Sequence, residues 1–181
     1  MTNSHIAIKP FAWDDWSALW TIRLAQLAEH GIVLDFTAIP EYPQPGIDDE
    51  YEWDSHHMDS VYLCDAGHFW LAWYTEHPVG YVGGQDVGGA IELRRMYVEE
   101  SYRRLGVGRK LVETLITHNH AQGVQAIELW TAMDGPGWWL YRALGFRKTE
   151  GPGIEFQDIM MRTRYTPGAD EIRMRLDVRD L

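Results

Sequence analysis

Glycine and arginine residues cluster at one point of the sequence in a pattern that can bind an anion. Residues 96–110 read MYVEESYRRLGVGRK, and in them Arg103-x-x-Gly106-x-Gly108 lies between a strand-like run and a helical pattern. Glycines at a helix start leave backbone N–H groups uncovered by a Cβ atom. These N–H groups and the positive end of the helix dipole bind phosphate. Because basic side chains accompany them, the pattern predicts a site for a di- or polyphosphate.

Two common phosphate motifs do not fit this stretch. A P-loop has Ser or Thr after Gly-Lys, whereas Gly108 here precedes Arg109 and Lys110. A dinucleotide fingerprint has a third glycine three residues after the second, and Leu111 stands at that place. A solvated basic turn that binds no ligand is the alternative that this motif leaves open when it is taken alone.

The elements around the motif follow from hydrophobic periodicity and turn residues. The long helix after the motif has its apolar residues on one face, and aromatic and β-branched runs before it alternate with turns. This order of elements predicts a mixed α/β (α+β) sheet with helices on its faces. We expect strands at 5–9, 68–75, 79–85, 90–98, 126–131, 154–164 and 171–178, helices at 14–29, 106–119 and 138–144, a helical segment within 48–62, and a loop at 37–47.

Composition excludes several classes of protein. The 181 residues are 45% hydrophobic, which is too apolar for a disordered chain and sufficient for one core. No apolar run approaches the roughly 20 residues that span a bilayer, and the N-terminus lacks a signal-peptide pattern. The single cysteine, Cys64, excludes an internal disulfide and a cysteine-based zinc site. We therefore expect a cytoplasmic protein that does not enter a membrane.

Charge is distributed unevenly along the chain. Residues 24–93 contain 13 Asp and Glu but no Lys or Arg, and 14 of the 16 basic residues lie at or after Arg94. The sequence pI near 5.1 argues against a nucleic-acid partner, which requires a basic surface. The asymmetry predicts two binding surfaces of opposite charge, and plain solubility is the alternative explanation.

Two ordered motifs resemble the GCN5-related N-acetyltransferase (GNAT) superfamily. In that family the motif Arg/Gln-x-x-Gly-x-Gly/Ala follows the fourth strand and binds the pyrophosphate of acetyl-CoA. Residues 103–108 match this motif and also follow a predicted strand. The family's later Leu-Tyr-x-x-x-Gly-Phe motif is matched by residues 140–146, after a strand and a short helix. The resemblance covers residues 90–148 by motif, and the rest of the chain by order of elements.

The resemblance implies a particular fold and domain organisation. The fold would be a GNAT-like mixed, mostly antiparallel sheet of about seven strands flanked by about four helices. One acyl-CoA N-acyltransferase domain would span residues 1–181. Within it, residues 1–89 would form the acceptor side, 90–148 the CoA-binding core and 154–178 a C-terminal hairpin.

The resemblance also implies acetyl-CoA as co-substrate and the residues that contact it. A backbone N–H near Tyr97 or Val98 would polarise the thioester carbonyl. Asp134 and Gly137 stand where many relatives have Asn and Ala, and an ionised Asp cannot donate a hydrogen bond as Asn does. The implied cofactor-binding residues are Met96, Tyr97, Val98, Arg103, Arg104, Leu105, Gly106, Val107, Gly108, Arg109, Asp134 and Tyr141.

Two residues are the catalytic candidates that the resemblance implies. Tyr141 matches the general acid that protonates the departing thiolate. Glu92 stands where similar proteins place a carboxylate that deprotonates the amine through water, a step needed because an alkylammonium has a pKa near ~10.4. Glu128 on the neighbouring strand is a second candidate base. The structural alternatives are a tyrosine packed on the sheet and a solvent-facing glutamate.

The remaining expectations concern metals, acceptor and partners. The pairs His56-His57 and His118/His120 lack the spacing and the third ligand of a metal site, so we expect solvated histidines and no metal. The acidic stretch predicts a cationic amine as acceptor, and similar proteins are often homodimers. A non-catalytic acyl-CoA-binding sensor and a site for another nucleotide are the competing hypotheses.

Overall fold

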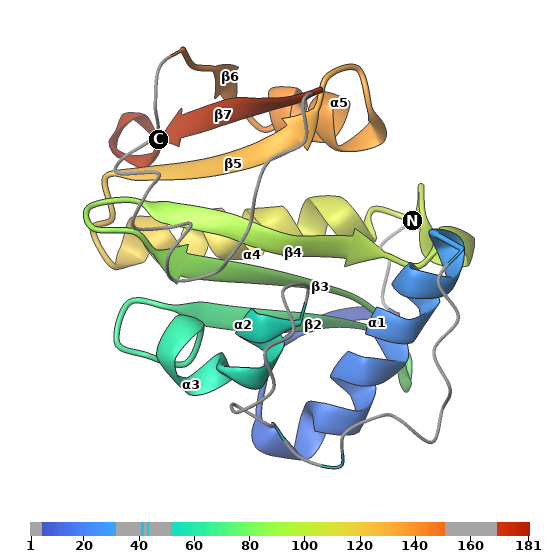
Figure 1. The fold of residues 1–181 in the computed structure, drawn as a ribbon. Coiled ribbons are helices and arrows are strands. Elements are labelled where there is room, and N and C mark those ends of the chain that lie inside the picture. Colours follow the sequence, from blue (N-terminus) through green and yellow to red (C-terminus); the bar gives the residue numbers. More distant parts are fainter. Residues whose placement is uncertain (1–4, 32–40, 42, 44–51, 151–169) are drawn as a thin grey trace.

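The computed structural model describes residues 5–31, 41, 43, 52–150 and 170–181, and within these ranges it contains seven strands and five α-helices (Figure 1). Short 3₁₀ turns at Trp13–Asp15, Glu100–Tyr102 and Val178–Asp180 join or end them. In chain order the elements are β1 (Ile6–Pro10), α1 (Trp16–Glu29), α2 (Trp53–His56), α3 (Met58–Val61), β2 (His68–Tyr74), β3 (His77–Asp86), β4 (Ile91–Val98), α4 (Val107–Ala121), β5 (Ala126–Ala132), α5 (Pro136–Ala143), β6 (Arg147–Lys148) and β7 (Glu171–Asp177).

The seven strands form one sheet in the order β1-β2-β3-β4-β5-β7-β6. Each neighbouring pair is antiparallel except β4 and β5, which run parallel. A parallel pair requires a long crossover connection, and α4 supplies it. The predicted fold class, a mixed and mostly antiparallel sheet with helices on its faces, is confirmed.

The strands β4 and β5 pair over a short distance only and then diverge (Figure 1). Their register joins Ile91 to Ile127 and Glu92 to Glu128, and no further pair follows along either strand. Arg95 has a positive φ of 50°, and the pairing of β4 with β3 shifts register between Tyr81 and Gly83. These irregularities mark a β-bulge, which bends a strand and increases its twist. The ends of β4 and β5 are therefore separated.

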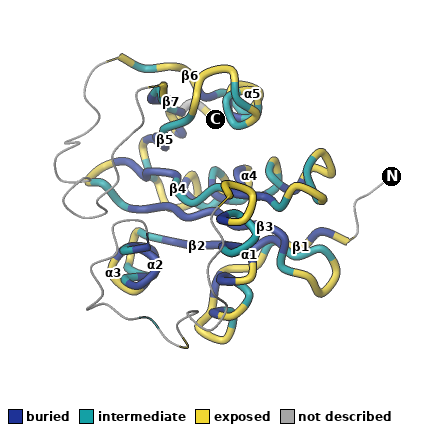
Figure 2. Tube along the Cα trace, turned by 45° about the vertical axis from the view of Figure 1, so that its right-hand side comes forward, coloured by how far each residue is buried: buried dark blue, intermediate teal, exposed yellow. Residues whose placement is uncertain are grey.

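Helices cover both faces of the sheet (Figure 2). On one face the buried residues of α4, among them Val107, Leu111 and Leu115, pack against β3 and β4. On the other face α1 and the single-turn helices α2 and α3 form a second, aromatic-rich cluster with β2, β3 and the end of β4. The members of that second cluster are Phe11, Trp16, Leu19, Trp20, Ile22, Met58, Val61, Tyr62, Phe69, Leu71, Tyr81 and Tyr97.

Most predicted elements are present with shifted ends, and a few differ. The helical segment expected within residues 48–62 consists of two separate turns, α2 and α3. The two-residue strand β6, which pairs with β7, was not predicted. The strand predicted at 154–164, and with it the first half of the C-terminal hairpin, lies outside the described residues. Most of the loop predicted at 37–47 lies outside them too.

The described residues contain neither a candidate membrane-spanning helix nor a candidate metal site. None of the helices in these ranges is both long enough and apolar enough to cross a membrane. Among the same residues, no three His, Cys, Asp or Glu side chains come together in a group that could hold a metal ion.

Candidate functional site

The start of α4 has the geometry of an anion-binding helix terminus. Gly106 precedes the helix in the left-handed conformation with a φ of 86°, which glycine adopts without strain. The first hydrogen bond of this helix runs from the N–H of Lys110 to the carbonyl of Gly106, at 3.0 Å. The amides of Val107, Gly108 and Arg109 come before it, in the turn whose N–H groups have no intrahelical acceptor. These amides and the helix dipole attract an anion.

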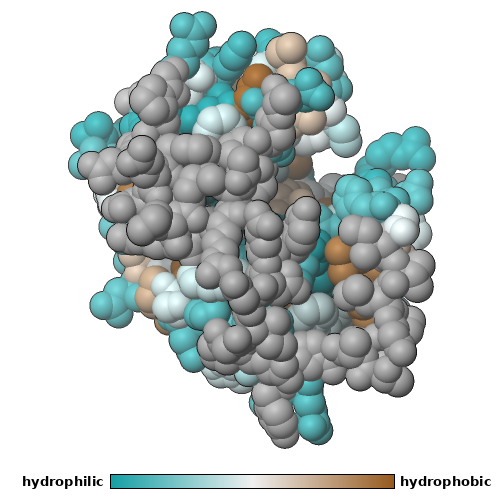
Figure 3. All heavy atoms as spheres, viewed as in Figure 1, coloured by the Kyte–Doolittle hydropathy of each residue, from teal (hydrophilic) through white to brown (hydrophobic). Residues whose placement is uncertain are grey.

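Gly108 brings this helix start close to the end of β4 and to α5. A Cβ atom added at Gly108 would lie 3.1 Å from Cε of Met96, 3.5 Å from Cδ2 of Leu140 and 3.7 Å from Cγ2 of Val98. The structure therefore brings together residues of both sequence motifs where β4 and β5 diverge. In the space-filling view the molecule is indented on the right, between α5 and the loop before α4 (Figure 3).

Arg103 stabilises the loop before α4 through contacts inside the protein. Its Nε donates to the carbonyl of Val98 at 2.9 Å, and its Nη2 donates to Oε2 of Glu29 at 2.6 Å. The same carboxylate oxygen accepts a hydrogen bond from the hydroxyl of Tyr97 at 2.9 Å. The hydrogen bond from Arg103 lowers the pKa of Glu29. The last turn of α1 is thereby tied both to β4 and to the loop before α4.

The other predicted cationic side chains lie near the surface. Arg109 forms an ion pair with Glu113 at 3.3 Å, and Nζ of Lys110 lies 3.5 Å from the carbonyl of Ile6. Arg104 is exposed, has a φ of 62°, and forms no ion pair with another described residue. Of the four basic residues in the motif, Arg104 is therefore the one whose side chain is available to a phosphate without breaking a contact.

Tyr141 lies on α5 with its ring buried against the sheet. It contacts Phe146 edge-on, with ring centroids 5.6 Å apart, and a Cβ added at Gly137 would lie 3.2 Å from its Cε2. Burial raises the pKa of Tyr141 well above its ordinary value, so the phenol keeps its proton at neutral and mildly alkaline pH. Its hydroxyl forms no hydrogen bond with another residue in the described part of the chain. The side chain is therefore both packed on the sheet and able to donate a proton.

The segment before Tyr141 has an unusual backbone. Asp134 adopts a left-handed φ of 61°, which Asp tolerates better than most residues. Gly135 and Pro136 then begin α5, and the position of a Cβ at Gly137 would be 3.1 Å from Oγ1 of Thr131. An alanine at this place would therefore press on β5, whereas glycine fits.

Glu92 is buried, and its side chain has no hydrogen-bond partner among the described residues. The residue is 3% exposed, so the expectation of a solvent-facing glutamate is wrong. Its Oε2 is buried and has no hydrogen-bond partner among the described residues. Burial raises the pKa of Glu92, although the charge of Arg94 opposes the shift. A carboxyl with a raised pKa in a buried position is a typical feature of an acid–base site.

Glu128 stands beside Glu92 in the register of β4 and β5 but has a different environment. Its Oε1 and Oε2 accept hydrogen bonds from Arg173 at 2.6 and 3.1 Å, and Oε1 accepts another from Arg175 at 2.7 Å. Both arginines extend from β7. Because its oxygens are already held by two arginines, Glu128 is a poorer candidate for the base than Glu92.

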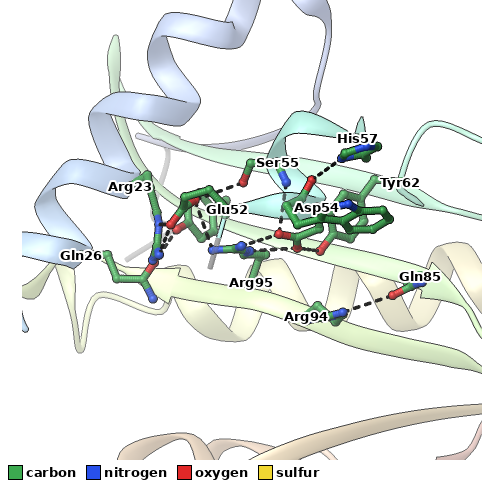
Figure 4. Close-up of polar contacts among 12 residues, drawn as sticks. Arg23, Gln26, Glu52, Asp54, Ser55, His57, Tyr62, Gln85, Arg94 and Arg95 are labelled. Atoms are coloured by element: carbon green, nitrogen blue, oxygen red, sulfur yellow. Dashed lines mark hydrogen bonds and ion pairs between the residues drawn. The ribbon is translucent and has the colours of Figure 1, made fainter. Parts of the chain in front are cut away.

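A buried ion-pair network lies on the same face of the sheet, beneath α1 and α2 (Figure 4). Arg23 of α1 donates from Nε to Oε1 of Glu52 at 2.7 Å. Arg95 at the bulge of β4 donates from Nε to Oδ2 of Asp54 at 2.9 Å, and its Nη1 lies 3.6 Å from Oε2 of Glu52. Tyr62 also donates to Asp54. These two carboxylates of the acidic stretch are therefore committed to arginines inside the protein.

The network predicts a large loss of stability for the variant Asp54→Asn. Burial alone would raise the pKa of Asp54, but the charge and hydrogen bonds of Arg95 outweigh it and hold the pKa well below its ordinary value. Removing one partner of a buried ion pair costs about 3–5 kcal/mol, and we expect about 3 kcal/mol because Glu52 still faces Arg95. Urea unfolding measures the change. The exposed Asp65→Asn should differ from the wild type by under about 0.5 kcal/mol, and an equal effect of the two variants would contradict the prediction.

The histidines differ from what the sequence predicts. His56 is buried, with its ring 6.4 and 6.0 Å from the ring centroids of Trp16 and Trp20, so the solvated interpretation is wrong for it. His118 packs on His68 and Trp70. Neither the Arg95–Asp54 pair nor the Glu29–Arg103 pair was found by sequence reasoning, and the only signal for them was the excess of acidic residues.

Comparison with known proteins agrees with this geometry. The model of the acetyltransferase (GNAT) family matches residues 34–146, which is more than half of the chain. The chain therefore belongs to the acetyltransferase (GNAT) family.

Individual relatives are also acetyltransferases by name, and each matches about half of this chain. A Bacillus subtilis (strain 168) protein assigned as an acetyltransferase is 31% identical over 102 residues, which are 56% of this chain and 63% of that protein. N-acetyltransferase 8 of Homo sapiens is 30% identical over 104 residues, 53% of this chain and 46% of that protein. This chain thus spans less than two thirds of the length of either relative.

Solved structures share the fold. An acetyltransferase of the GNAT family from Staphylococcus aureus Mu50 superposes with a TM-score of 0.69 at 20% identity, covering 96% of this chain and 99% of that one. The PaiA N-acetyltransferase from Thermoplasma acidophilum, solved in complex with coenzyme A, gives a TM-score of 0.63 at 14% identity, covering 95% and 98%.

Proposed function

We propose that this chain is an N-acetyltransferase that moves an acetyl group from acetyl-CoA to a primary amine within a ternary complex. The observation that carries the proposal is the start of α4, where Gly106 and Gly108 present backbone amides beside the diverging ends of β4 and β5. Membership of the acetyltransferase family supports it. The complex of PaiA N-acetyltransferase with coenzyme A supports the choice of CoA as the ligand.

The residues present fit the diphosphate and the arm of this co-substrate. The amides of Val107, Gly108 and Arg109 would hold the diphosphate, with Arg104 as the additional cation. The arm would lie between the diverging strands and pair with backbone groups of β4 from Met96 to Tyr97. The carbonyl of Val98 already accepts a hydrogen bond from Arg103, so it has less to offer a ligand. The co-substrate supplies the activated acetyl group.

The proton transfers can be assigned to two side chains. Glu92, through water, would take the proton that the amine nitrogen loses as its bond to the acetyl carbon forms. A backbone N–H at the end of β4 would stabilise the negative charge on the carbonyl oxygen. Tyr141 would donate its proton to the sulfur as the carbon–sulfur bond breaks. The raised pKa values of Glu92 and Tyr141 agree with these roles.

The acceptor that we propose is cationic before it loses its proton. Residues 24–93 carry 13 Asp and Glu and no Lys or Arg. Among the described acids of this stretch, Glu52 and Asp54 are buried against arginines, Glu29 pairs with Arg103, and Glu92 is buried. Glu41, Asp59, Asp65 and Glu76 are exposed, and they would attract an ammonium group with an effect that weakens in salt. A polyamine, an amino sugar and a peptide amine all meet this description.

A thiol-release screen tests the proposal. Acetyl-CoA is offered with amines of different charge, and mass spectrometry identifies an acetylated product. We expect release of CoA thiol with cationic amines, and a kcat/KM that decreases as ionic strength increases. Tight CoA binding without thiol release over a broad panel would instead favour the acyl-CoA sensor. Equal thermal stabilisation by CoA, ATP and NAD would favour a general nucleotide site.

The variant Gly106→Ala should specifically weaken the binding of CoA. Alanine is strained at a φ of 86°, so the loop must rotate and redirect the amides that follow. Losing one hydrogen bond to a charged group corresponds to about tenfold in Kd, which calorimetric titration with CoA measures. Gly88→Ala is the matched control, because Gly88 has a φ of 83° in the turn between β3 and β4 with nothing within 4 Å. Equal CoA affinity of the two variants would count against the assigned loop.

A further inference from the structure

A cavity of about 580 Å³ lies at the start of α1, between that helix and the single-turn helices α2 and α3. Its volume falls in the range of small-molecule sites. Neither of the proposed catalytic residues and none of the proposed CoA-binding residues lines it. The described residues around it are Trp13, Asp14, Trp16, Glu41, Pro43, His56, His57, Met58, Asp59 and Ser60.

Aromatic rings form the walls of this cavity. Trp13 is 42% exposed although it is a large apolar side chain, and its ring centroid lies 6.0 Å from that of Trp16. Phe11 supports Trp13 edge-on at 5.6 Å. The negatively charged face of an indole ring attracts a cation that loses its water there. An exposed tryptophan held in place by its neighbours is therefore suited to contact a ligand.

The charge at the cavity has one sign. Asp14, Glu41 and Asp59 bring three carboxylates, and none of their side chains forms an ion pair or hydrogen bond with another described residue. No Lys or Arg occurs among the described lining residues. In contrast to Glu52 and Asp54, these carboxylates are therefore not neutralised by arginines of the described part of the chain.

The cavity is remote from the loop before α4 and from the end of β4. Trp16, which lines it, is the first residue of α1, and Glu29, which holds Arg103 and Tyr97, is the last. Fourteen helical residues span about 20 Å. A small ligand in the cavity therefore cannot reach the ends of β4 and β5.

We propose that this cavity is a binding site for a small organic cation, an alkylammonium group with an apolar body, separate from the site of acetyl transfer. Its indole faces match the apolar body and the positive charge, and its unpaired carboxylates match the charge alone. A neutral or anionic ligand of the same shape would use the walls but not the carboxylates.

Choline provides a direct test, by calorimetric titration of the protein in the absence of acetyl-CoA. Its quaternary nitrogen has no lone pair and accepts no acetyl group, so the result does not depend on the proposed transferase activity. We expect saturable binding of choline, and no measurable binding of 3,3-dimethyl-1-butanol, which has the same shape without the charge. Equal affinity for the two compounds, or no binding of choline, would overturn the proposal.

Variants locate the site. Trp13→Ala should weaken choline binding about fivefold by loss of the cation–π contact, and the exposed Asp59→Asn should weaken it in the same direction without disturbing packing. Trp139→Ala on α5 and Glu76→Gln in the turn after β2 are matched controls that should leave the Kd unchanged. Glu92→Gln should also leave it unchanged. If both cavity variants bound choline like the wild type, or if Glu92→Gln abolished binding, the assignment would be wrong.

Discussion

Replacing Glu92 by Gln is expected to reduce kcat/KM for the amine by about 10²–10⁴-fold, the contribution typical of a general base. The amide preserves the size of the side chain but cannot accept the proton. Because burial raises the pKa of Glu92, wild-type activity should decrease on the acid side at a pH above the ordinary range of a carboxyl group. The variant should lack that acid limb. A pH–rate profile with the same limb in both proteins would assign the base to another group or to water.

The stability of the Glu92→Gln variant should not decrease with its activity. A carboxyl whose pKa is raised by folding stabilises the protein while it is protonated, and this contribution is lost as the pH rises through its folded-state pKa. Above the folded-state pKa of Glu92, the glutamine variant should therefore be at least as stable as the wild type with an ionised Glu92. Glu128→Gln is the informative counterpart, since it leaves the 8% exposed Arg173 without its carboxylate. We expect thermal melting to show destabilisation for Glu128→Gln only.

Replacing Tyr141 by Phe should lower kcat by about 10²–10⁴-fold while the Kd for CoA stays unchanged. The ring and its contact with Phe146 are retained, so that only the proton donor to the departing sulfur is lost. Stopped-flow detection of the CoA thiol measures the rate, and calorimetric titration measures the affinity.

A matched substitution separates this role from a general effect of removing a phenol. Tyr74→Phe makes the same change on β2, two strands away from β4 in the sheet order, and should leave kcat within about twofold. Unaltered turnover in Tyr141→Phe would remove the tyrosine from the mechanism. A parallel loss of CoA affinity would indicate a binding role instead.

Local sequence signals were sufficient to predict the fold and the glycine-containing helix start of α4. The apolar face of α4 and the alternation in β7 fixed the type of each element, and Gly106 and Gly108 indicated a helix start with accessible amides. The resemblance to the acetyltransferase family then predicted the sheet, since the family's two motifs stand in the same order and context. All of these signals lie within a few residues of the feature that they predict.

The alternation of apolar and polar residues along β4 could not predict that Glu92 is buried. Ile91 and Leu93 face the cluster beneath α4, but after the bulge at Arg95 the residues on that face are Met96 and Val98. A bulge inserts one residue and exchanges the two faces of a strand. No pattern in the sequence marks its position, so the face of a given side chain could not be assigned.

The ion pairs were unpredictable for a different reason. Arg95 and Asp54 are 41 residues apart in the sequence, and Arg103 and Glu29 are 74 apart. Their pairing depends on how α1 and α2 dock on the sheet, which is a property of the tertiary structure. The same dependence explains why the contacts of Arg103 with Val98 and Glu29 were not predicted.

The contact of Asp54 with Arg95 has a consequence for redesign of the protein. The ion pair fastens the short helix α2 to the bulge of β4, beside the cleft that we propose for the acyl group, by charges that must stay matched. Replacing the segment between α1 and β2 by that of a relative would therefore change the carboxylate partner of the ion pair and leave its arginine in place. Chimaeras of this kind, made to exchange the proposed acceptor preference, would require that Arg23 and Arg95 are transferred together with the grafted segment. The alternative is to replace both arginines by apolar residues at the same time.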